Sequence, residues 1–210
     1  KGYLPITIKS GGFNGGITKL RCDKSSQYLS AILLCAPYAK KDVSIKIIGE
    51  LVSKPYIDIT LSMMRDFGVN VKNKCYKEFF VRSGQVYSGR EYQIEGDFDN
   101  SSFFFAAAAI TQGRIRIKNL NPKSMQGGKI FVDLLKKMGC KVNKGPDWIE
   151  VIGKPLKGIK ADMGDYPDSV LPLSVVAAFA EGKSEFYNIS HLKYKECNRL
   201  SAPATELRKM

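Results

Sequence analysis

The sequence predicts an α/β fold built from repeated βαβαββ units, and a recurring segment is the main reason. Residues 62–71 ("SMMRDFGVNV") and residues 133–142 ("DLLKKMGCKV") share one pattern of helix, glycine and strand. Apolar residues recur at helical spacing up to Gly68 or Gly139, the residue type that often ends a helix, and an alternating strand follows. The helical pattern returns at the end of the chain as "TELRKM". The spacing of about 70 residues fits stacked βαβαββ units better than a solenoid repeat.

The elements of the first complete unit follow in order from residue 17. Short runs rich in β-branched and aromatic residues predict its strands, and apolar residues at helical spacing predict its helices. A serine stands at or before each helix start, and Pro55 occupies the first position of the second helix, where proline is favoured. The expected order is strand 17–20, helix 26–38, strand 43–48, helix 55–67, strand 69–72 and strand 79–82.

The later units are recognised by the same pattern. The second runs from residue 92 to residue 152, with helices expected at residues 102–111 and 127–138, and a third begins near residue 159. The opening residues 4–10 ("LPITIKS") alternate like the last strands of the first two units, "EFFVRSG" and "WIEVIGK". We therefore expect residues 4–10 to be the last strand of an earlier unit, and the chain to be truncated inside a larger fold at both ends.

Composition narrows the function classes. A hydrophobic content of 44% is enough for a core, and no apolar run reaches the roughly 18 residues that a membrane helix needs. The five cysteines are scattered, and only one histidine is present, which argues against a zinc site or a disulfide framework and for a reducing cytosol. The net charge of +13 suits nucleic acid, a membrane surface or small anionic substrates. Dispersed lysines and the lack of an aromatic RNA-binding pattern disfavour nucleic acid.

Each unit places helix starts at corresponding positions. Counting back equally from the ends of the three second helices leads to Ser53, Ser124 and Glu196. The first helix of the first unit also begins with hydroxyls, at Ser25 and Ser26. Free N–H groups at a helix start bind anions, whereas a serine there also caps the helix and contributes about 1 kcal/mol. The pattern alone leaves both roles open.

The third unit carries most of the charge at such positions. Asp165 and Asp168 flank a proline at the start of an apolar helix, where the helix dipole favours carboxylates. The following turn region contains His191, Lys193, Lys195, Glu196 and Arg199. Taken alone, the two aspartates are explained as helix caps, and the charged turn region is explained as a solvated face. Their joint occurrence at equivalent helix starts instead indicates a shared polar site.

These motifs resemble 5-enolpyruvylshikimate-3-phosphate synthase, also called 3-phosphoshikimate 1-carboxyvinyltransferase. The matching segments are "SSQYLSAILLCAP", "LVSKPYIDITLSMM", "IEGDFDNSSFFFAAAA", "SMQGG", "DMGDYPDSVLPLSVVAAFAEG" and "KYKECNRLSAPATELRKM", in the family's order. The resemblance implies a central fragment of a two-lobed enolpyruvyl transferase fold, an inside-out α/β barrel. It assigns residues 1–94, the end of one unit plus a full unit, to one lobe. Residues 95–210, a full unit plus a truncated one, belong to the other.

The resemblance also implies an activity. The family transfers the enolpyruvyl group of phosphoenolpyruvate to the 5-hydroxyl of shikimate 3-phosphate and releases phosphate, without metal or cofactor, in aromatic amino acid biosynthesis in the cytoplasm. By position, Ser25, Ser26 and Ser53 resemble ligands of the shikimate 3-phosphate phosphate. Gln27 and Tyr56 would line the ring of that substrate.

The third unit supplies the remaining roles that the resemblance implies. Asp168 resembles the carboxylate that accepts the 5-hydroxyl proton, and Lys195 resembles the lysine that contacts the same substrate. Glu196 and Arg199 resemble the phosphoenolpyruvate-side acid/base and clamp. His191 is included among the substrate-binding residues.

Several features set limits on this interpretation. Asn198 and Gly127 stand where the family usually has aspartate. The family's N-terminal lysine, arginine and glycine-rich segment and its C-terminal arginines and lysine fall outside the 210 residues, so we expect this chain alone to be inactive. The alternatives are a UDP-N-acetylglucosamine enolpyruvyl transferase, or a non-catalytic anion-binding fragment.

Overall fold

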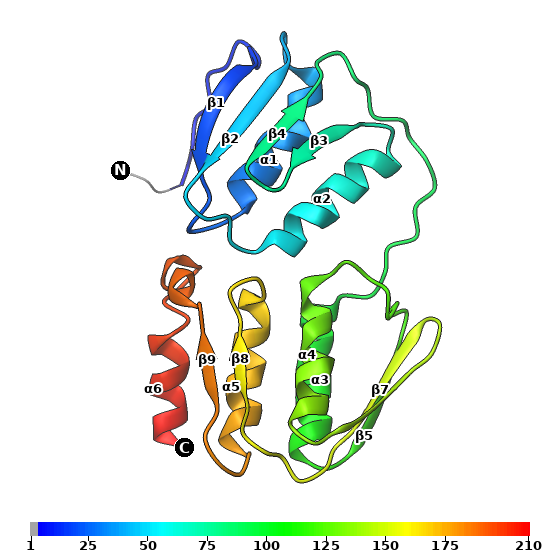
Figure 1. Ribbon diagram of the computed structural model, residues 1–210, viewed down its shortest axis with the longest axis vertical. Helices are drawn as coiled ribbons and strands as arrows, with labels where there is room; N and C mark the ends of the chain where they lie inside the picture. Colours follow the sequence, from blue (N-terminus) through cyan, green and yellow to red (C-terminus); the bar gives the residue numbers. More distant parts are fainter. Residues whose placement is uncertain (1–3) are drawn as a thin grey trace.

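The first half of the chain is a four-stranded sheet with two helices packed on one face. A computed structural model describes residues 4–210 (Figure 1). The elements of this half are β1 (Gly16–Arg21), α1 (Gln27–Cys35), η1 (Ala36–Tyr38), β2 (Val43–Ile48), α2 (Lys54–Asp66), β3 (Val71–Lys74) and β4 (Glu78–Val81). The strand order is β1-β2-β4-β3, in which β1 and β2 are parallel and the other pairs are antiparallel. The helices bury their apolar faces against alternate residues of β2 and β4.

The second half contains two smaller sheets and four helices. Its first part is α3 (Phe98–Ile110), β5 (Arg114–Lys118), η2 (Gly127–Lys129), α4 (Ile130–Lys137), β6 (Lys141–Lys144) and β7 (Trp148–Ile152). Its second part is β8 (Lys160–Asp162), η3 (Pro167–Ser169), α5 (Val170–Ala178), β9 (Glu185–Tyr187), η4 (Ser190–Tyr194) and α6 (Ser201–Lys209). Strands β5-β7-β6 form an antiparallel sheet, and β8 pairs in parallel with β9.

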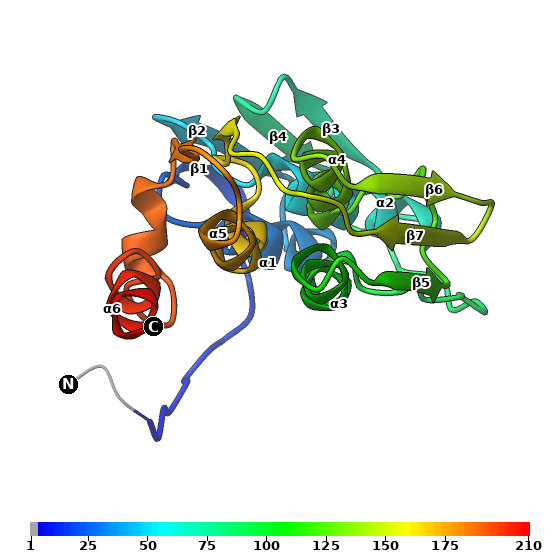
Figure 2. The same ribbon diagram turned by 90° about the horizontal axis from the view of Figure 1, so that it is seen from below.

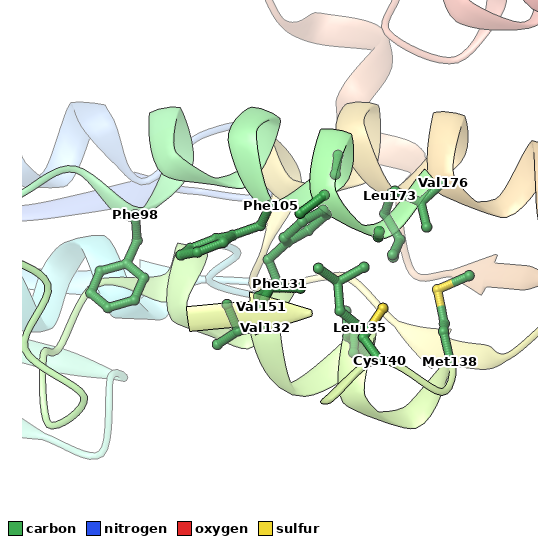
Figure 3. Packing of buried hydrophobic residues seen from close by; sticks show 14 of the residues in the cluster. Phe98, Phe105, Phe131, Val132, Leu135, Met138, Cys140, Val151, Leu173 and Val176 are labelled. Atoms are coloured by element: carbon green, nitrogen blue, oxygen red, sulfur yellow. The ribbon is translucent and has the colours of Figure 1, made fainter. Parts of the chain in front are cut away.

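Each half has its own hydrophobic core. Residues between Cys22 and Val81 form the first, and residues between Phe98 and Leu192 form the second. In the second, Phe105 of α3, Phe131 of α4 and Leu173 of α5 are buried together (Figure 3). Figure 2 shows α3, α4 and α5 end-on, with the sheet β5-β7-β6 outside them. Helices α3 and α5 are apolar almost all round. One face of each packs in the core of this half, whereas Phe103 and Phe104 of α3 and Val175 of α5 are exposed.

Two expected strands and one expected helix start were wrong. Residues 4–10 form no strand: they are exposed and pair with none of the described strands, and an alternating pattern needs a neighbour to become a ladder. The second unit was expected to open with a strand from residue 92, but none precedes α3: Ile94 and Gly96 hydrogen-bond to Asn119, and Gly96 O accepts from Gln126, without forming a ladder. Helix α3 begins at Phe98 rather than residue 102, because the Asp97 carboxylate accepts the N–H groups of the first turn.

The expected helices of the first unit and the helix that ends at Gly139 lie close to the expected ranges. The glycines Gly68 and Gly139 have φ of 91° and 116°, the left-handed conformation that terminates helices. Within residues 4–210, no helix is long and apolar enough to cross a membrane.

Candidate functional site

Several helix starts meet where the two halves of the chain come together. Figure 1 shows the first turn of α2 at the edge of the first half that faces the second half. The backbone N–H of Lys54, the first residue of α2, donates to Oδ1 of Asp165, 3.1 Å away. Gly127 of the second half packs on Pro55, since a Cβ built on this glycine would lie 3.3 Å from the proline Cβ. Direct contacts therefore connect the two halves at the start of α2.

Tyr56 lies at the centre of a polar network in this junction. Its phenol Oη lies 2.9 Å from Oδ2 of Asp99, at the start of α3, and 2.7 Å from Oδ2 of Asp168 in η3. Arg199 donates through Nη1 to Oδ1 of Asp168 and through Nε to Oε1 of Glu196, the latter at 2.7 Å. Four residues expected from the sequence are thus joined in one network, together with Asp99, which was not expected.

The charges of this network are set by its hydrogen bonds and by burial. Burial raises the pKa of Asp168, but the hydrogen bonds from Arg199 and Tyr56 and the positive charge of Lys195 outweigh it, so the pKa falls below the ordinary value. Burial opposes the charge of Arg199, yet Glu196 and Asp168 raise its pKa. Asp168 is therefore an ionised carboxylate that is paired with a guanidinium.

The pKa values of Tyr56 and Asp99 are raised, whereas that of Asp168 is lowered. Burial, followed by the negative charges of Asp99 and Asp168, raises the pKa of Tyr56, so its phenol stays protonated. Burial also raises the pKa of Asp99, and the charges of Asp168 and Asp97 add to this effect. The hydrogen bond from Tyr56 and the charge of Arg199 offset it only in part.

The serines at the two helix starts do not act alike. Ser25 lies just before Ser26, the N-cap residue of α1, and its Oγ accepts the N–H of Gln27, the first residue of α1, at 3.2 Å. Ser26 is buried, and its Oγ donates to the backbone carbonyl of Ser53 at 3.4 Å, so it does not cap. Ser53 has φ of 58°, and its buried Oγ has no hydrogen-bond partner among residues 4–210. A strained backbone with an unpartnered buried hydroxyl is typical of a binding position.

A cavity of about 490 Å³ lies beside the start of α2. Lys54, Asp165 and His191 contribute to its wall. His191 is buried, and its Nε2 has no hydrogen-bond partner in the described part of the chain. Burial and the charge of Lys195 lower the pKa of His191 more than Asp165, Asp168 and Glu50 raise it, so the ring is neutral.

The remaining expected residues lie around this site with fewer contacts. Lys195 is half-buried and close enough for its charge to act on both Asp168 and His191. Gln27 is exposed, and its side chain makes no hydrogen bond to residues 4–210. Within the same residues, no group of three or more His, Cys, Asp or Glu side chains is placed to bind a metal ion.

The two departures from the family pattern have local explanations. Asn198 accepts the N–H groups of Leu200 and Ser201, at 3.1 Å and 3.2 Å, and so begins α6 without an ion pair. The residue that follows "QG" is Gly128, so the departure assigned to Gly127 belongs to Gly128. A Cβ on Gly128 would lie 2.3 Å from Oδ1 of Asp99. The Asp99 carboxyl group therefore fills the space in which a side chain at position 128 would begin.

Comparison with known proteins identifies the family. A family model described as EPSP synthase (3-phosphoshikimate 1-carboxyvinyltransferase) matches residues 1–210. The chain belongs to the EPSP synthase family. A 3-phosphoshikimate 1-carboxyvinyltransferase from Mannheimia haemolytica is 45% identical over 212 residues, which cover 100% of this chain and 49% of that protein. One from Marinomonas sp. is 46% identical over 211 residues and is covered to 50%.

Solved structures agree with this family. EPSP synthase from Acinetobacter baumannii superposes with a TM-score of 0.74 at 25% identity, covering 95% of this chain and 46% of that one. The enolpyruvyl transferase NikO from Streptomyces tendae shares the fold, with a TM-score of 0.60 at 18% identity. The predicted family and the predicted α/β enolpyruvyl transferase fold are confirmed. The chain spans about half the length of the curated EPSP synthases that it matches.

Proposed function

We propose that the protein containing this chain is a 3-phosphoshikimate 1-carboxyvinyltransferase. It transfers the enolpyruvyl group of phosphoenolpyruvate to the 5-hydroxyl of shikimate 3-phosphate and releases phosphate. The observation that carries the proposal is the ionised Asp168 carboxylate, held by Tyr56 and Arg199 among converging helix starts. Such a carboxylate is suited to accept the proton of the attacking hydroxyl. Family membership supports this reaction over that of a UDP-N-acetylglucosamine transferase.

The site offers binding groups that suit the first substrate. The phosphate of shikimate 3-phosphate would bind at the starts of α1 and α2, beside Ser25, Ser26 and the unpartnered hydroxyl of Ser53. Gln27, Tyr56 and His191 would contact the rest of this substrate. Because these residues of separate helices are already held close together, less entropy is lost when the substrate binds.

Groups on the second half suit phosphoenolpyruvate. Arg199 would contact its anionic groups, and Glu196, held by Arg199 at 2.7 Å, would exchange a proton with the enol carbon. Lys195 adds positive charge beside Asp168. Preorganised charge of this kind stabilises charge that develops in a transition state.

The two hydrophobic cores support a division into two lobes, with residues 1–94 in one and residues 95–210 in the other. Each core contains residues from one side of this boundary. In this proposal the rest of a cytoplasmic enzyme supplies further cations for phosphoenolpyruvate. Losing one preorganised contact commonly costs about 3 kcal/mol of transition-state stabilisation, and several contacts are missing at once from the 210-residue chain, so this chain alone would be inactive.

The test is phosphate release from phosphoenolpyruvate plus shikimate 3-phosphate. The full-length protein should turn over, and Asp168→Asn should lower kcat by a factor of about 10² to 10⁴, the usual contribution of a general base. Asp133→Asn is a matched control, because this aspartate lies on the surface of α4 and, among residues 4–210, forms an ion pair only with Lys144 of β6. An absence of turnover in the full-length protein would refute the function. An unimpaired Asp168→Asn variant would remove Asp168 from the mechanism.

A further inference from the structure

The hydrogen bonds of Tyr56 need one more proton than Tyr56 can supply. Its phenol oxygen lies 2.9 Å from a carboxyl oxygen of Asp99 and 2.7 Å from a carboxyl oxygen of Asp168. A phenol carries a single O–H, whereas an ionised carboxylate is an acceptor only. Two ionised carboxylates would leave one of these short contacts without a hydrogen. A proton on one of the two carboxyl groups, donated to Tyr56 Oη, would give each of these contacts its own hydrogen.

The surroundings indicate which carboxyl group carries the proton. Asp168 accepts a hydrogen bond from the guanidinium of Arg199, whose positive charge favours the ionised carboxylate, and Lys195 adds to the positive field. Asp99 forms no ion pair with any of residues 4–210. Its Oδ1 is instead enclosed by the backbone of Gly128, where a Cβ would lie only 2.3 Å away. Enclosure favours the neutral form of a carboxyl group that has no ion-pair partner.

The groups that face Asp99 from the packed elements agree with this assignment. Tyr56 of α2, Asp168 of η3 and Arg199 face it from other elements, and Asp97 faces it from its own. Burial is the largest influence and raises the pKa of Asp99, and the two neighbouring carboxylates raise it further. Tyr56 and Arg199 act in the opposite direction without reversing the shift.

We propose that Asp99 is a positioning residue that holds this second proton and donates it to Tyr56 Oη, so that Tyr56 donates its own O–H to Asp168. No covalent bond changes, and the two protons are shared along the line Asp99, Tyr56, Asp168. A phenol that accepts one hydrogen bond becomes a stronger donor of the next. The significance of this arrangement for catalysis rests on the proposed function. The hydrogen bond from Tyr56 keeps Asp168 ionised until the substrate hydroxyl arrives.

The arrangement is tested by the ¹³C carboxyl signals of Asp99 and Asp168, followed by NMR during a pH titration of the 210-residue chain. Asp99 should keep the signal of its protonated form at pH values at which Asp168 already gives the ionised signal, and Asp168→Asn should lower the midpoint of Asp99 because a neighbouring negative charge is removed. Asp99 titrating at or below the ordinary value, or unaffected by Asp168→Asn, would overturn the proposal.

Variants at position 99 distinguish donation by Asp99 from acceptance. If Asp99 donates, Asp99→Ala weakens the hydrogen bond from Tyr56 and raises the midpoint of Asp168, whereas Asp99→Asn retains a donor and leaves it close to that of the unchanged protein. If Asp99 is instead an anion that accepts from Tyr56, both variants free the phenol and lower the midpoint of Asp168, which refutes the proposal.

Tyr76→Phe is the matched control for a lost phenol. Tyr76 Oη lies 2.7 Å and 2.9 Å from the two oxygens of one carboxylate, Asp58, so a single proton satisfies it. Tyr76→Phe should leave the titrations of Asp99 and Asp168 unchanged. A shift of the Asp168 midpoint as large as that caused by Asp99→Ala would count against a local network. The readout needs no turnover, so an inactive enzyme with the expected titration would refute only the proposed function.

Discussion

The N–H of Lys54 donates to the carboxylate of Asp165, 3.1 Å away, although the two residues are 111 positions apart in the sequence. Lys54 is the first residue of α2, and the preceding Ser53 makes no side-chain capping bond. Asp165 therefore provides from the second half the cap that the first half lacks. The cap also joins the two halves beside the proposed phosphate position.

Asp165→Ala should destabilise the protein by about 1 kcal/mol, the usual cost of a lost helix cap. Asp165→Asn should lose less, because its amide oxygen still accepts the N–H. Urea unfolding measures both. The control is Glu185→Gln, which breaks an exposed pair with Lys160 and should change stability by at most about 0.5 kcal/mol. Equal stability of Asp165→Ala and Glu185→Gln would show that the cap contributes nothing.

Gly128→Ala should disturb the Tyr56 network without removing any of its members. The new Cβ would lie 2.3 Å from Oδ1 and 2.9 Å from the backbone N of Asp99, so the main chain must move as well. Overpacking of this kind costs about 1–3 kcal/mol. Gly89→Ala is the control, since nothing lies within 4 Å of its added Cβ. The melting temperature of Gly128→Ala should be lower than that of Gly89→Ala. Equal melting temperatures would contradict the close approach of Gly128 to Asp99.

Glu150 should give the protein a distinct response to acid. Its side chain in β7 is only 2% exposed and accepts hydrogen bonds from Asn143, Arg114 and Arg116. The Asn143 bond is the largest influence, and together with the two arginines it outweighs burial and lowers the pKa of Glu150 to about 2.

A folded-state pKa below the unfolded value contributes stability that is present above about pH 4.5 and is lost as the pH falls toward about 2. Glu150→Gln should lower the melting temperature at neutral pH and flatten its dependence on pH within this window. Glu185→Gln, which removes a carboxylate from the exposed pair with Lys160, is the control. Parallel curves for all three proteins would show that Glu150 does not titrate in this way.

Local sequence signals predicted most of the fold. The helix, glycine and strand pattern around Gly68 and Gly139 depends on neighbouring residues and on the freedom of glycine at positive φ, so it is readable from sequence. The strand expected at residues 4–10 depends on a partner, and alternation alone does not supply one. The start of α3 was misplaced although Asp97, followed by Asp99 and Asn100, carries a readable capping signal.

The site was predictable where a motif repeats and not where it depends on packing. Tyr56 and Asp168 were expected, but their contact spans 112 positions. Asp99 lies in the matching segment "IEGDFDNSSFFFAAAA", but its role arises from the enclosing backbone of Gly128 and from Tyr56, 43 positions earlier. An acidic residue in the first turn of a helix at an equivalent position of the repeat was the available signal.

The most direct test of the account is an amide NMR titration of the 210-residue chain with shikimate 3-phosphate, with shikimate as the control that lacks the phosphate. We expect shikimate 3-phosphate to shift the amides of Ser25, Ser26, Ser53 and Lys54 together with those near Asp168, and shikimate to leave the serine amides almost unchanged. Shifts confined to other surfaces, or equal shifts with both compounds, would contradict a phosphate site at the paired starts of α1 and α2.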